Sequence, residues 1–228
     1  MKKIKIALFL IIVFGIGFFL YKKYLKKEYV IQNSSSVVLK DYPKTKDSIT
    51  QIKKQLKSKS TKEIGSEFTR LISTKIFPYW YGTKWGFYGT TEKPNEGEIA
   101  CGYFVTTTLR DMGVPIKRSK LAQLASEEMI KILVSSSNIQ RFSNIDINTF
   151  EAKLKSAGNG IFVVGLDNHT GFLLISNDGD YFIHSSGIFP YKVEKDVLSK
   201  SPILVRSKYR VVGKLSADKD FLNNWIKN

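Results

Sequence analysis

One cysteine and two histidines are the residues of this 228-residue chain best suited to nucleophilic chemistry. Cys101 is the only cysteine, and His169 and His184 are the only histidines. A thiol becomes a strong nucleophile when a neighbouring base takes its proton, and imidazole does this near neutral pH. A further polar side chain commonly fixes the tautomer of that base. The set predicts a thiol hydrolase in which Cys101 is the nucleophile, His169 the base and His184 the orienting residue.

The nucleophile is expected at the start of a helix. The pattern over residues 101–112 is helical, and Gly113 is placed as its C-terminal stop. A helix N-terminus favours an anion, so we expect a lowered pKa for the Cys101 thiol. The free N–H groups of the first turn can also stabilise an oxyanion, and Gly102 leaves room beside the sulfur.

The two histidines are expected on neighbouring strands, over residues 169–176 and 181–185, joined by a turn at residues 177–179. A turn at residues 178–179 would offset the histidines by four residues, or roughly 13 Å at about 3.3 Å per residue. A turn centred near Asn177 halves this offset and keeps both side chains on one face. Contact between the histidines therefore requires that register or a bulge.

Helical patterns precede strand patterns along the chain, which indicates an α+β domain. The first helix is expected from a cap at Asp47 or Ser48, and the second from the capping box at residues 60–63 to Pro78. Further helices are expected over residues 119–133, from Asp146 or Asn148 to Gly158, and over 221–227. A buried strand at residues 160–165 and one or two strands at 203–214 complete the expected elements.

The N-terminus is expected to anchor the chain in a membrane. Residues 6–21 are apolar and precede no signal-peptidase motif, so we interpret residues 1–27 as an uncleaved signal anchor, 28–46 as a polar tether and 47–228 as the catalytic domain. Lysines flank the apolar run on both sides, so charge alone does not orient it. We expect a single pass in the inner (cytoplasmic) membrane with the domain outside, in the periplasm, because its apparent chemistry belongs there.

The net charge of +16 belongs mostly to the first third of the chain. A basic segment beside a membrane usually meets anionic lipid or an anionic wall polymer. The rest of the chain is nearly balanced and carries no nucleic-acid-binding motif, so nucleic acid is not an expected partner. The cysteine and histidines lack a recognised zinc spacing, and no carboxylate cluster accompanies them in the sequence. No phosphate-binding motif is present, so neither a metal nor another cofactor is expected.

Three segments resemble the NlpC/P60 hydrolases. They correspond to the nucleophile segment, the histidine strand and the third-residue strand of that family: Ile99-Ala100-Cys101-Gly102-Tyr103-Phe104-Val105, His169-Thr170-Gly171-Phe172-Leu173 and Phe182-Ile183-His184-Ser185-Ser186. The resemblance covers roughly residues 77–187. It implies a papain-like fold and a cysteine peptidase or amidase that cleaves amide bonds of peptidoglycan stem peptides in the cell wall.

The chain departs from the family pattern at two places. The usual Asp-Cys-Ser-Gly is replaced by residues 100–103, Ala-Cys-Gly-Tyr. The family also carries a tyrosine upstream of the nucleophile, near the oxyanion site; by spacing Tyr88 matches it best, with Trp85 and Tyr81 as alternatives. The aromatic segment 79–99 that contains them is interpreted either as a wall of the substrate groove or as ordinary core.

Two other functions remain open. One is a transglutaminase-like enzyme, suggested by residues 109–115, although that family normally has an aspartate where His184 stands. The other is a membrane-tethered wall-binding or scaffold protein that keeps a papain-like shape without activity. An unreactive Cys101 would distinguish it from both enzymes.

Overall fold

A computed structural model describes residues 41–227 of the chain. The chain divides into two units, Met1–Tyr42 and Pro43–Asn228, and the description below concerns the second. The expected anchor at residues 6–21 and residues 28–40 of the expected tether lie outside the described residues. Within residues 41–227, no helix is both long enough and apolar enough to cross a membrane.

Helices dominate the first half of the described chain and strands the second half. The helices are α2 (Tyr42–Gln55), α3 (Thr61–Leu71), the π-helix η1 (Ile72–Ile76), α4 (Phe77–Trp80), α5 (Cys101–Asp111), α6 (Arg118–Ala122), α7 (Ser126–Leu133), the 3₁₀ helix η2 (Ser136–Asn138), α8 (Ile147–Ser156), the 3₁₀ helix η3 (Leu198–Lys200), α9 (Pro202–Arg206), the 3₁₀ helix η4 (Leu215–Ala217) and α10 (Lys219–Lys227). The strands are β1 (Lys84–Trp85), β2 (Glu98–Ile99), β3 (Ile139–Ser143), β4 (Gly160–Leu166), β5 (Thr170–Ser176), β6 (Gly179–Ser185), β7 (Val193–Val197) and β8 (Tyr209–Lys214).

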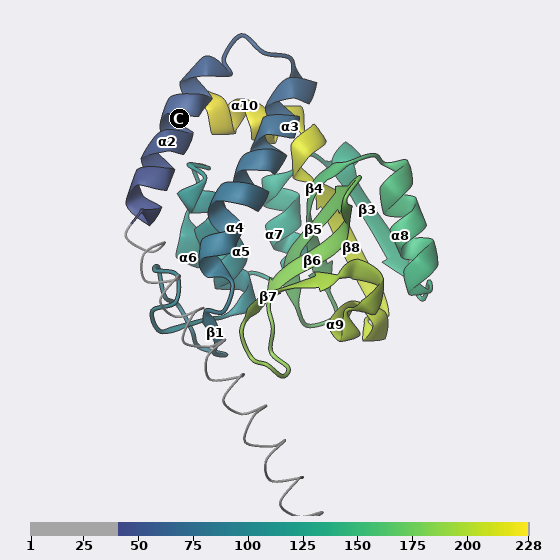
Figure 1. The fold of residues 1–228 in the computed structure, drawn as a ribbon. Coiled ribbons are helices and arrows are strands. Elements are labelled where there is room, and N and C mark those ends of the chain that lie inside the picture. The colour runs from purple at the N-terminus through teal and green to yellow at the C-terminus, as the bar shows by residue number, and fades with distance from the viewer. Residues whose placement is uncertain (1–40, 228) are drawn as a thin grey trace, which may run out of the picture. The chain divides into compact units, whose positions relative to one another are not determined.

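A six-stranded antiparallel sheet with the order β3-β8-β4-β5-β6-β7 forms the centre of this unit. Helices α3, α5 and α7 pack on one face, while α8 and α9 cover the other (Figure 1). Because both faces are covered, every residue of β4 is buried, which explains its uninterrupted apolar sequence. The expected α+β class, with helices packed on an antiparallel sheet, is confirmed.

The N-terminal helices extend beyond their expected limits. Helix α2 begins at Tyr42, so the last five residues of the expected tether 28–46 are helical. Pro43 lies in the first turn, where its missing N–H costs no hydrogen bond. The capping box of Ser60 and Glu63 is present. Pro78 does not end the second helix, because it occupies the first turn of α4 after the π-helical turn η1.

Other expectations are corrected in the second half. The single helix expected over residues 119–133 is two helices, α6 and α7. Residues 203–206 belong to α9 instead of a strand, and the strand of this region begins only at Tyr209. Strands β3 and β7 were not expected, because neither shows a clear alternation of apolar and polar residues.

Aromatic packing holds α5 against the sheet. The rings of Phe77 and Phe172 lie 5.0 Å apart, and Phe104 of α5 lies 6.1 Å from each of them. All three side chains are fully buried. Packed aromatic rings contribute about 0.5–1.5 kcal/mol per pair beyond the burial of area, so this cluster fixes the position of the helix that carries the cysteine.

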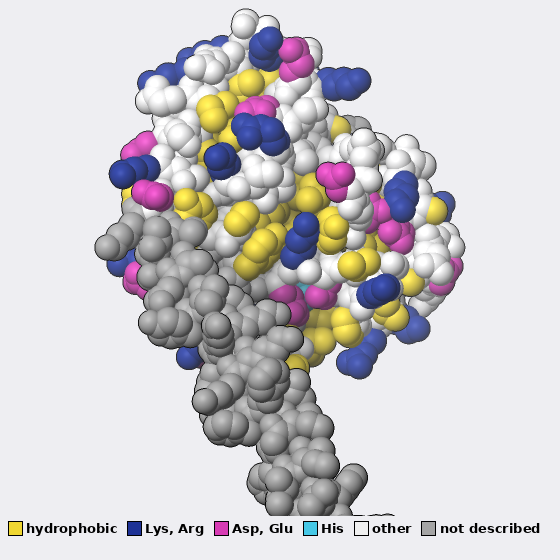
Figure 2. All heavy atoms as spheres, viewed as in Figure 1, with side chains coloured by type: hydrophobic (Ala, Val, Ile, Leu, Met, Phe, Trp, Pro, Cys, Tyr) yellow, Lys and Arg dark blue, Asp and Glu magenta, His cyan; other side chains and the backbone are white. Residues whose placement is uncertain are grey.

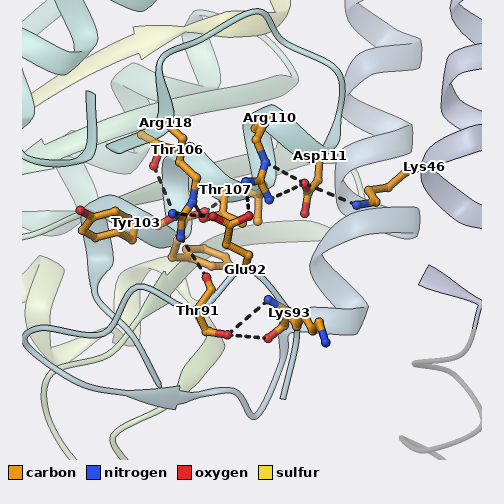
Figure 3. A network of polar contacts seen from close by, with 12 residues as sticks. Lys46, Thr91, Glu92, Lys93, Tyr103, Thr106, Thr107, Arg110, Asp111 and Arg118 are labelled. Carbon is orange, nitrogen blue, oxygen red and sulfur yellow. Dashed lines mark hydrogen bonds and ion pairs between the residues drawn. The ribbon is translucent and has the colours of Figure 1, made fainter. Parts of the chain in front are cut away.

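A polar network fixes the loop before α5 (Figure 3). The Arg118 guanidinium donates to the carbonyl oxygens of Thr90 and Thr91 at 2.7 and 3.0 Å, and to Thr107 Oγ1 of α5 at 2.7 Å. Glu92 accepts hydrogen bonds from both Arg118 and Arg110. Arg118 therefore ties α6, α5 and the loop together. Figure 2 shows other Lys and Arg side chains scattered over the visible face of the molecule, with no single basic patch there.

We predict that Arg118→Leu lowers the free energy of unfolding by about 1–3 kcal/mol. The carbonyl oxygens of Thr90 and Thr91 and the hydroxyl of Thr107 would lose their hydrogen-bond donor. Urea unfolding of the purified protein measures this loss of stability. Arg141→Leu is the matched control, because Arg141 also pairs with a glutamate, Glu127, but its side chain is 46% exposed, against 9% for Arg118. An exposed pair contributes at most about 1 kcal/mol. Equal losses in the two variants would contradict a positioning role for the network.

Candidate active site

Cys101 is the first residue of α5, as the sequence predicts. Ala100 before it is extended and provides no side-chain cap, so the N–H groups of the first turn have no capping side chain. The sulfur interacts with the backbone N–H groups of Thr170 and Gly102. Thr170 follows His169, so the start of β5 lies directly against the cysteine.

Gly102 is required by the close approach of a neighbouring helix. A Cβ atom at this position would lie 2.4 Å from the carbonyl oxygen of Ala122, at the end of α6. The space that the sequence suggested beside the sulfur is therefore occupied in part by backbone. Gly102 allows α6 to form one wall of the site.

His169 lies in a tight turn between β4 and β5, one residue before β5 begins, and not in the strand where the sequence predicts it. The N–H of Leu166 donates to the carbonyl oxygen of His169 at 2.8 Å, which closes the turn. Within the turn, the Asp167 carboxylate accepts hydrogen bonds from Ser207 Oγ and from the N–H groups of Lys208 and Tyr209. These three bonds anchor the turn to the segment that leads into β8.

The register of β5 and β6 brings the two histidines together. Ser176 pairs with Gly179, so the turn consists of residues 177–178, and Phe172 pairs with Ile183. His184 is then two residues from the position opposite His169, which is the register that the sequence required for contact. His169 Nε2 lies 3.0 Å from His184 Nδ1. Gly171 makes room for this contact, because a Cβ atom there would lie 2.8 Å from His184 Cβ.

His184 is completely buried and has a second polar partner. Its ring stacks on Phe182, with 4.1 Å between the centroids. Its Nε2 atom lies 3.3 Å from Asp196 Oδ2 and 3.9 Å from Glu194 Oε1, both on β7. The expectation that no carboxylate cluster accompanies the histidines is wrong, because β7 supplies two carboxylates. Figure 2 shows histidine atoms between acidic side chains on the visible face.

Within residues 41–227, one group has the composition and proximity to hold a metal ion: His184, Glu194 and Asp196, whose ligand atoms lie within 4.8 Å of one another. Both ring nitrogens of His184 are already within hydrogen-bonding distance of other side chains. His184 and Asp196 therefore belong to a row of hydrogen bonds that leads to His169.

Cys101 and His169 line the same cavity, which has a volume of about 280 Å³. Its walls come from the start of α5, from α6 and α7 with their connection, and from the β4–β5 turn. The lining residues are Cys101, Gly102, Ala122, Leu124, Ala125, Ser126, Met129, Leu166, Asp167, Asn168, His169 and Thr170. Most of these side chains are small or apolar, and none of them is cationic.

The aromatic residues proposed from the sequence lie outside this cavity. Tyr88 is 89% exposed, and Phe87 beside it is 72% exposed. Trp85 packs on Tyr191, with 6.2 Å between the ring centroids. Neither interpretation of the segment 79–99 holds throughout, because Trp80 belongs to the core while the tip of the loop faces solvent.

Burial determines the charge states of the cysteine and of the base. Burial lowers the pKa of His169 to about 3, with a smaller contribution from His184. Burial also raises the pKa of the Cys101 thiol, and the N–H groups of Thr170 and Gly102 only partly oppose this. The expected lowering of the thiol pKa is therefore wrong. Thiol and imidazole are both neutral near pH 7.

Comparisons with known proteins identify no family for this chain. No protein-family model matches, and no curated protein matches. Among solved structures, an N-acetylmuramoyl-L-alanine amidase from Bacteroides uniformis ATCC 8492 is similar at 13% sequence identity, with 67% of this chain and 99% of that chain covered and a TM-score of 0.36. This TM-score is too low to establish a shared fold.

We predict that His169 makes the protein less stable as the pH falls below about 6.5. The unfolded chain then binds a proton at this histidine, whereas the folded protein binds it only near pH 3. Each pH unit between these values lowers the free energy of unfolding by up to about 1.4 kcal/mol. Above pH 6.5 the neutral ring has no such effect.

Urea unfolding at pH 4.5, 5.5 and 7.5 tests this prediction when His169→Gln is measured beside the parent protein. Glutamine does not titrate, and its amide can still donate a hydrogen bond to His184. We expect the variant to lose less stability on acidification. Parallel stability curves for the two proteins would show that His169 titrates normally in the folded state.

Proposed function

We propose that this protein is a cysteine hydrolase that cleaves amide bonds. The observation that supports the proposal is the shared cavity: Cys101 at a helix N-terminus and His169 line it together, and His184 holds the His169 ring from behind. These are the three roles that nucleophilic catalysis by a thiol requires. Because thiol and imidazole are both neutral at rest, the proton must move as the sulfur attacks.

The reaction follows from these positions. His169 takes the thiol proton while the Cys101 sulfur attacks the amide carbonyl carbon. The N–H groups of the first turn of α5 stabilise the oxyanion of the tetrahedral intermediate. The intermediate collapses to a thioester, and the imidazolium of His169 gives its proton to the departing amine. A water molecule, deprotonated by His169, then hydrolyses the thioester and regenerates the thiol.

The proposed substrate is a peptidoglycan stem peptide, and the proposed fold is the papain-like fold of the NlpC/P60 type. The sequence resemblance around Cys101, His169 and His184 supports both, as does the order of the three residues along the chain. The apolar run at residues 6–21 supports a single-pass anchor in the inner membrane, with the domain on the periplasmic side where this substrate is found.

A non-catalytic wall-binding protein is the second candidate, and one observation favours it. The raised pKa of the Cys101 thiol means that little thiolate exists near neutral pH. A thiol retained only for packing would behave in this way. The two candidates differ in whether substrate is converted.

We predict that the purified protein releases soluble fragments from peptidoglycan and that Cys101→Ala abolishes the release. Mass spectrometry of the fragments identifies the bond that is cleaved. Cys101→Ser serves as a control of similar size. We expect it to lower the rate of release at least about 100-fold, because a hydroxyl is a weaker nucleophile than a thiol. Equal release by the parent and by Cys101→Ala, or no release by either, would refute the hydrolase proposal for this substrate.

We predict that protease added to spheroplasts digests the domain and leaves a membrane-bound N-terminal stub. Long domains can cross the membrane despite a small charge bias, so lysines on both sides of residues 6–21 do not prevent this orientation. A cytoplasmic marker protein must stay intact in the same sample. Protection of the full-length chain until the membrane is lysed would place the domain in the cytoplasm and exclude peptidoglycan as its substrate.

A further inference from the structure

Strand β7 adds a carboxylate to the far side of the histidine pair. Asp196 Oδ2 lies 3.3 Å from His184 Nε2, and His184 Nδ1 lies 3.0 Å from His169 Nε2. A continuous chain of side chains therefore runs from Asp196 through both rings to the cavity that contains Cys101. Asp196 has no part in the hydrolase proposed above.

The positions of the protons on His184 and His169 follow from the charge state of Asp196. Burial opposes ionisation of Asp196, but the hydrogen bond from His184 contributes to a net lowering of its pKa, so this carboxylate is ionised near neutral pH. An ionised carboxylate only accepts hydrogen bonds, so His184 must carry a proton on Nε2. In the neutral form of the ring this is the single N–H, and His184 Nδ1 is then an acceptor.

The tautomer of His169 follows from that of His184. Because His184 Nδ1 accepts, His169 Nε2 must donate the 3.0 Å hydrogen bond between them. His169 is neutral, so its one proton is used there and its Nδ1 atom keeps a free lone pair. A base needs such a lone pair to take the proton of a thiol.

We propose that Asp196 is a positioning residue that fixes the tautomers of both histidines and thereby keeps Nδ1 of His169 unprotonated. Its catalytic consequence rests on the proposed hydrolase function, whereas the tautomers themselves do not. Without the carboxylate, His184 is free to carry its proton on Nδ1 and donate to His169. The proton of His169 would then reside on Nδ1, and the base would be lost.

Other charged groups near the ring do not replace Asp196. Glu194 faces the same Nε2 atom at 3.9 Å, which is too long for a hydrogen bond. Burial raises the pKa of Glu194, with Asp196 adding to the effect, while Ser186, His184 and Lys192 oppose it. Phe182 covers one face of the His184 ring. Asp196 is thus the group that decides where the ring proton lies.

Histidine ¹⁵N NMR of the full-length protein in detergent micelles tests the proposal. The chain has only two histidines, so two ring spin systems are expected and each tautomer can be read from its nitrogen shifts. In the parent protein at pH 7.5, we expect both rings to be protonated on Nε2. A proton on Nδ1 of either ring would overturn the proposal.

Two substitutions of Asp196 and one of Glu194 complete the test. The asparagine amide of Asp196→Asn can either accept or donate a hydrogen bond, and the leucine side chain of Asp196→Leu can do neither. We therefore expect histidine rings protonated on Nδ1 to be populated in both variants. Asp196→Asn is close in shape to the parent residue, which keeps the test valid if Asp196→Leu does not fold. Glu194→Gln should retain the parent tautomers. The proposal is overturned if Glu194→Gln changes the tautomers or if Asp196→Asn leaves them unchanged.

Kinetics separate this inference from the proposed function. With peptidoglycan as substrate, Asp196→Asn should lower kcat at least about tenfold with little change in KM, because a wrong tautomer removes the base and not the binding site. An unchanged kcat would overturn the inference while the hydrolase function stood. Parent tautomers as expected, together with no hydrolysis by the parent protein, would refute the proposed function alone and leave the tautomer assignment intact.

Discussion

The hydrogen bond between His169 and His184 is the interaction on which the rest of the site depends. It exists only because β5 and β6 pair in one register, and a slip of one residue would turn one histidine to the opposite face of the sheet. Gly171 leaves space for the side chains of Phe182 and His184 on β6, and Asp167 fixes the turn that carries His169. The site is thus a property of the sheet as much as of its side chains.

The sequence predicted those parts of the site that have local signals. The start of α5 at Cys101 and the existence of β5 and β6 follow from periodicity and turn residues. The sequence did not decide the pairing register of β5 and β6, because a turn at residues 178–179 and a turn centred near Asn177 both place the histidines on one face of the sheet. Asp196 could not be found from the sequence: β7 has apolar residues only at its two ends, Val193 and Val197, and its pairing depends on β6.

The thiol pKa shows why a local signal can mislead about a property of the whole fold. The helix N-terminus at Cys101 is visible in the sequence, and it favours the thiolate. Burial is produced by packing of α6 and the β4–β5 turn, which follow α5 in the chain, and it outweighs the helix terminus. The exposed tip at Phe87 and Tyr88 escaped prediction for a related reason, since composition alone does not tell an aromatic core from an aromatic surface.

The position of β8 in the sheet determines when this protein can finish folding during its synthesis. Strand β8, which comes last in chain order among the strands of residues 41–227, lies between β3 and β4, so both have open edges until it is synthesised. The N–H groups that hold Asp167, those of Lys208 and Tyr209, emerge at the same time. A nascent chain that stops short of this strand therefore has unpaired edges exposed to aggregation, and the turn bearing His169 is not yet anchored. The active site therefore cannot be complete before β8 has been synthesised and has joined the sheet.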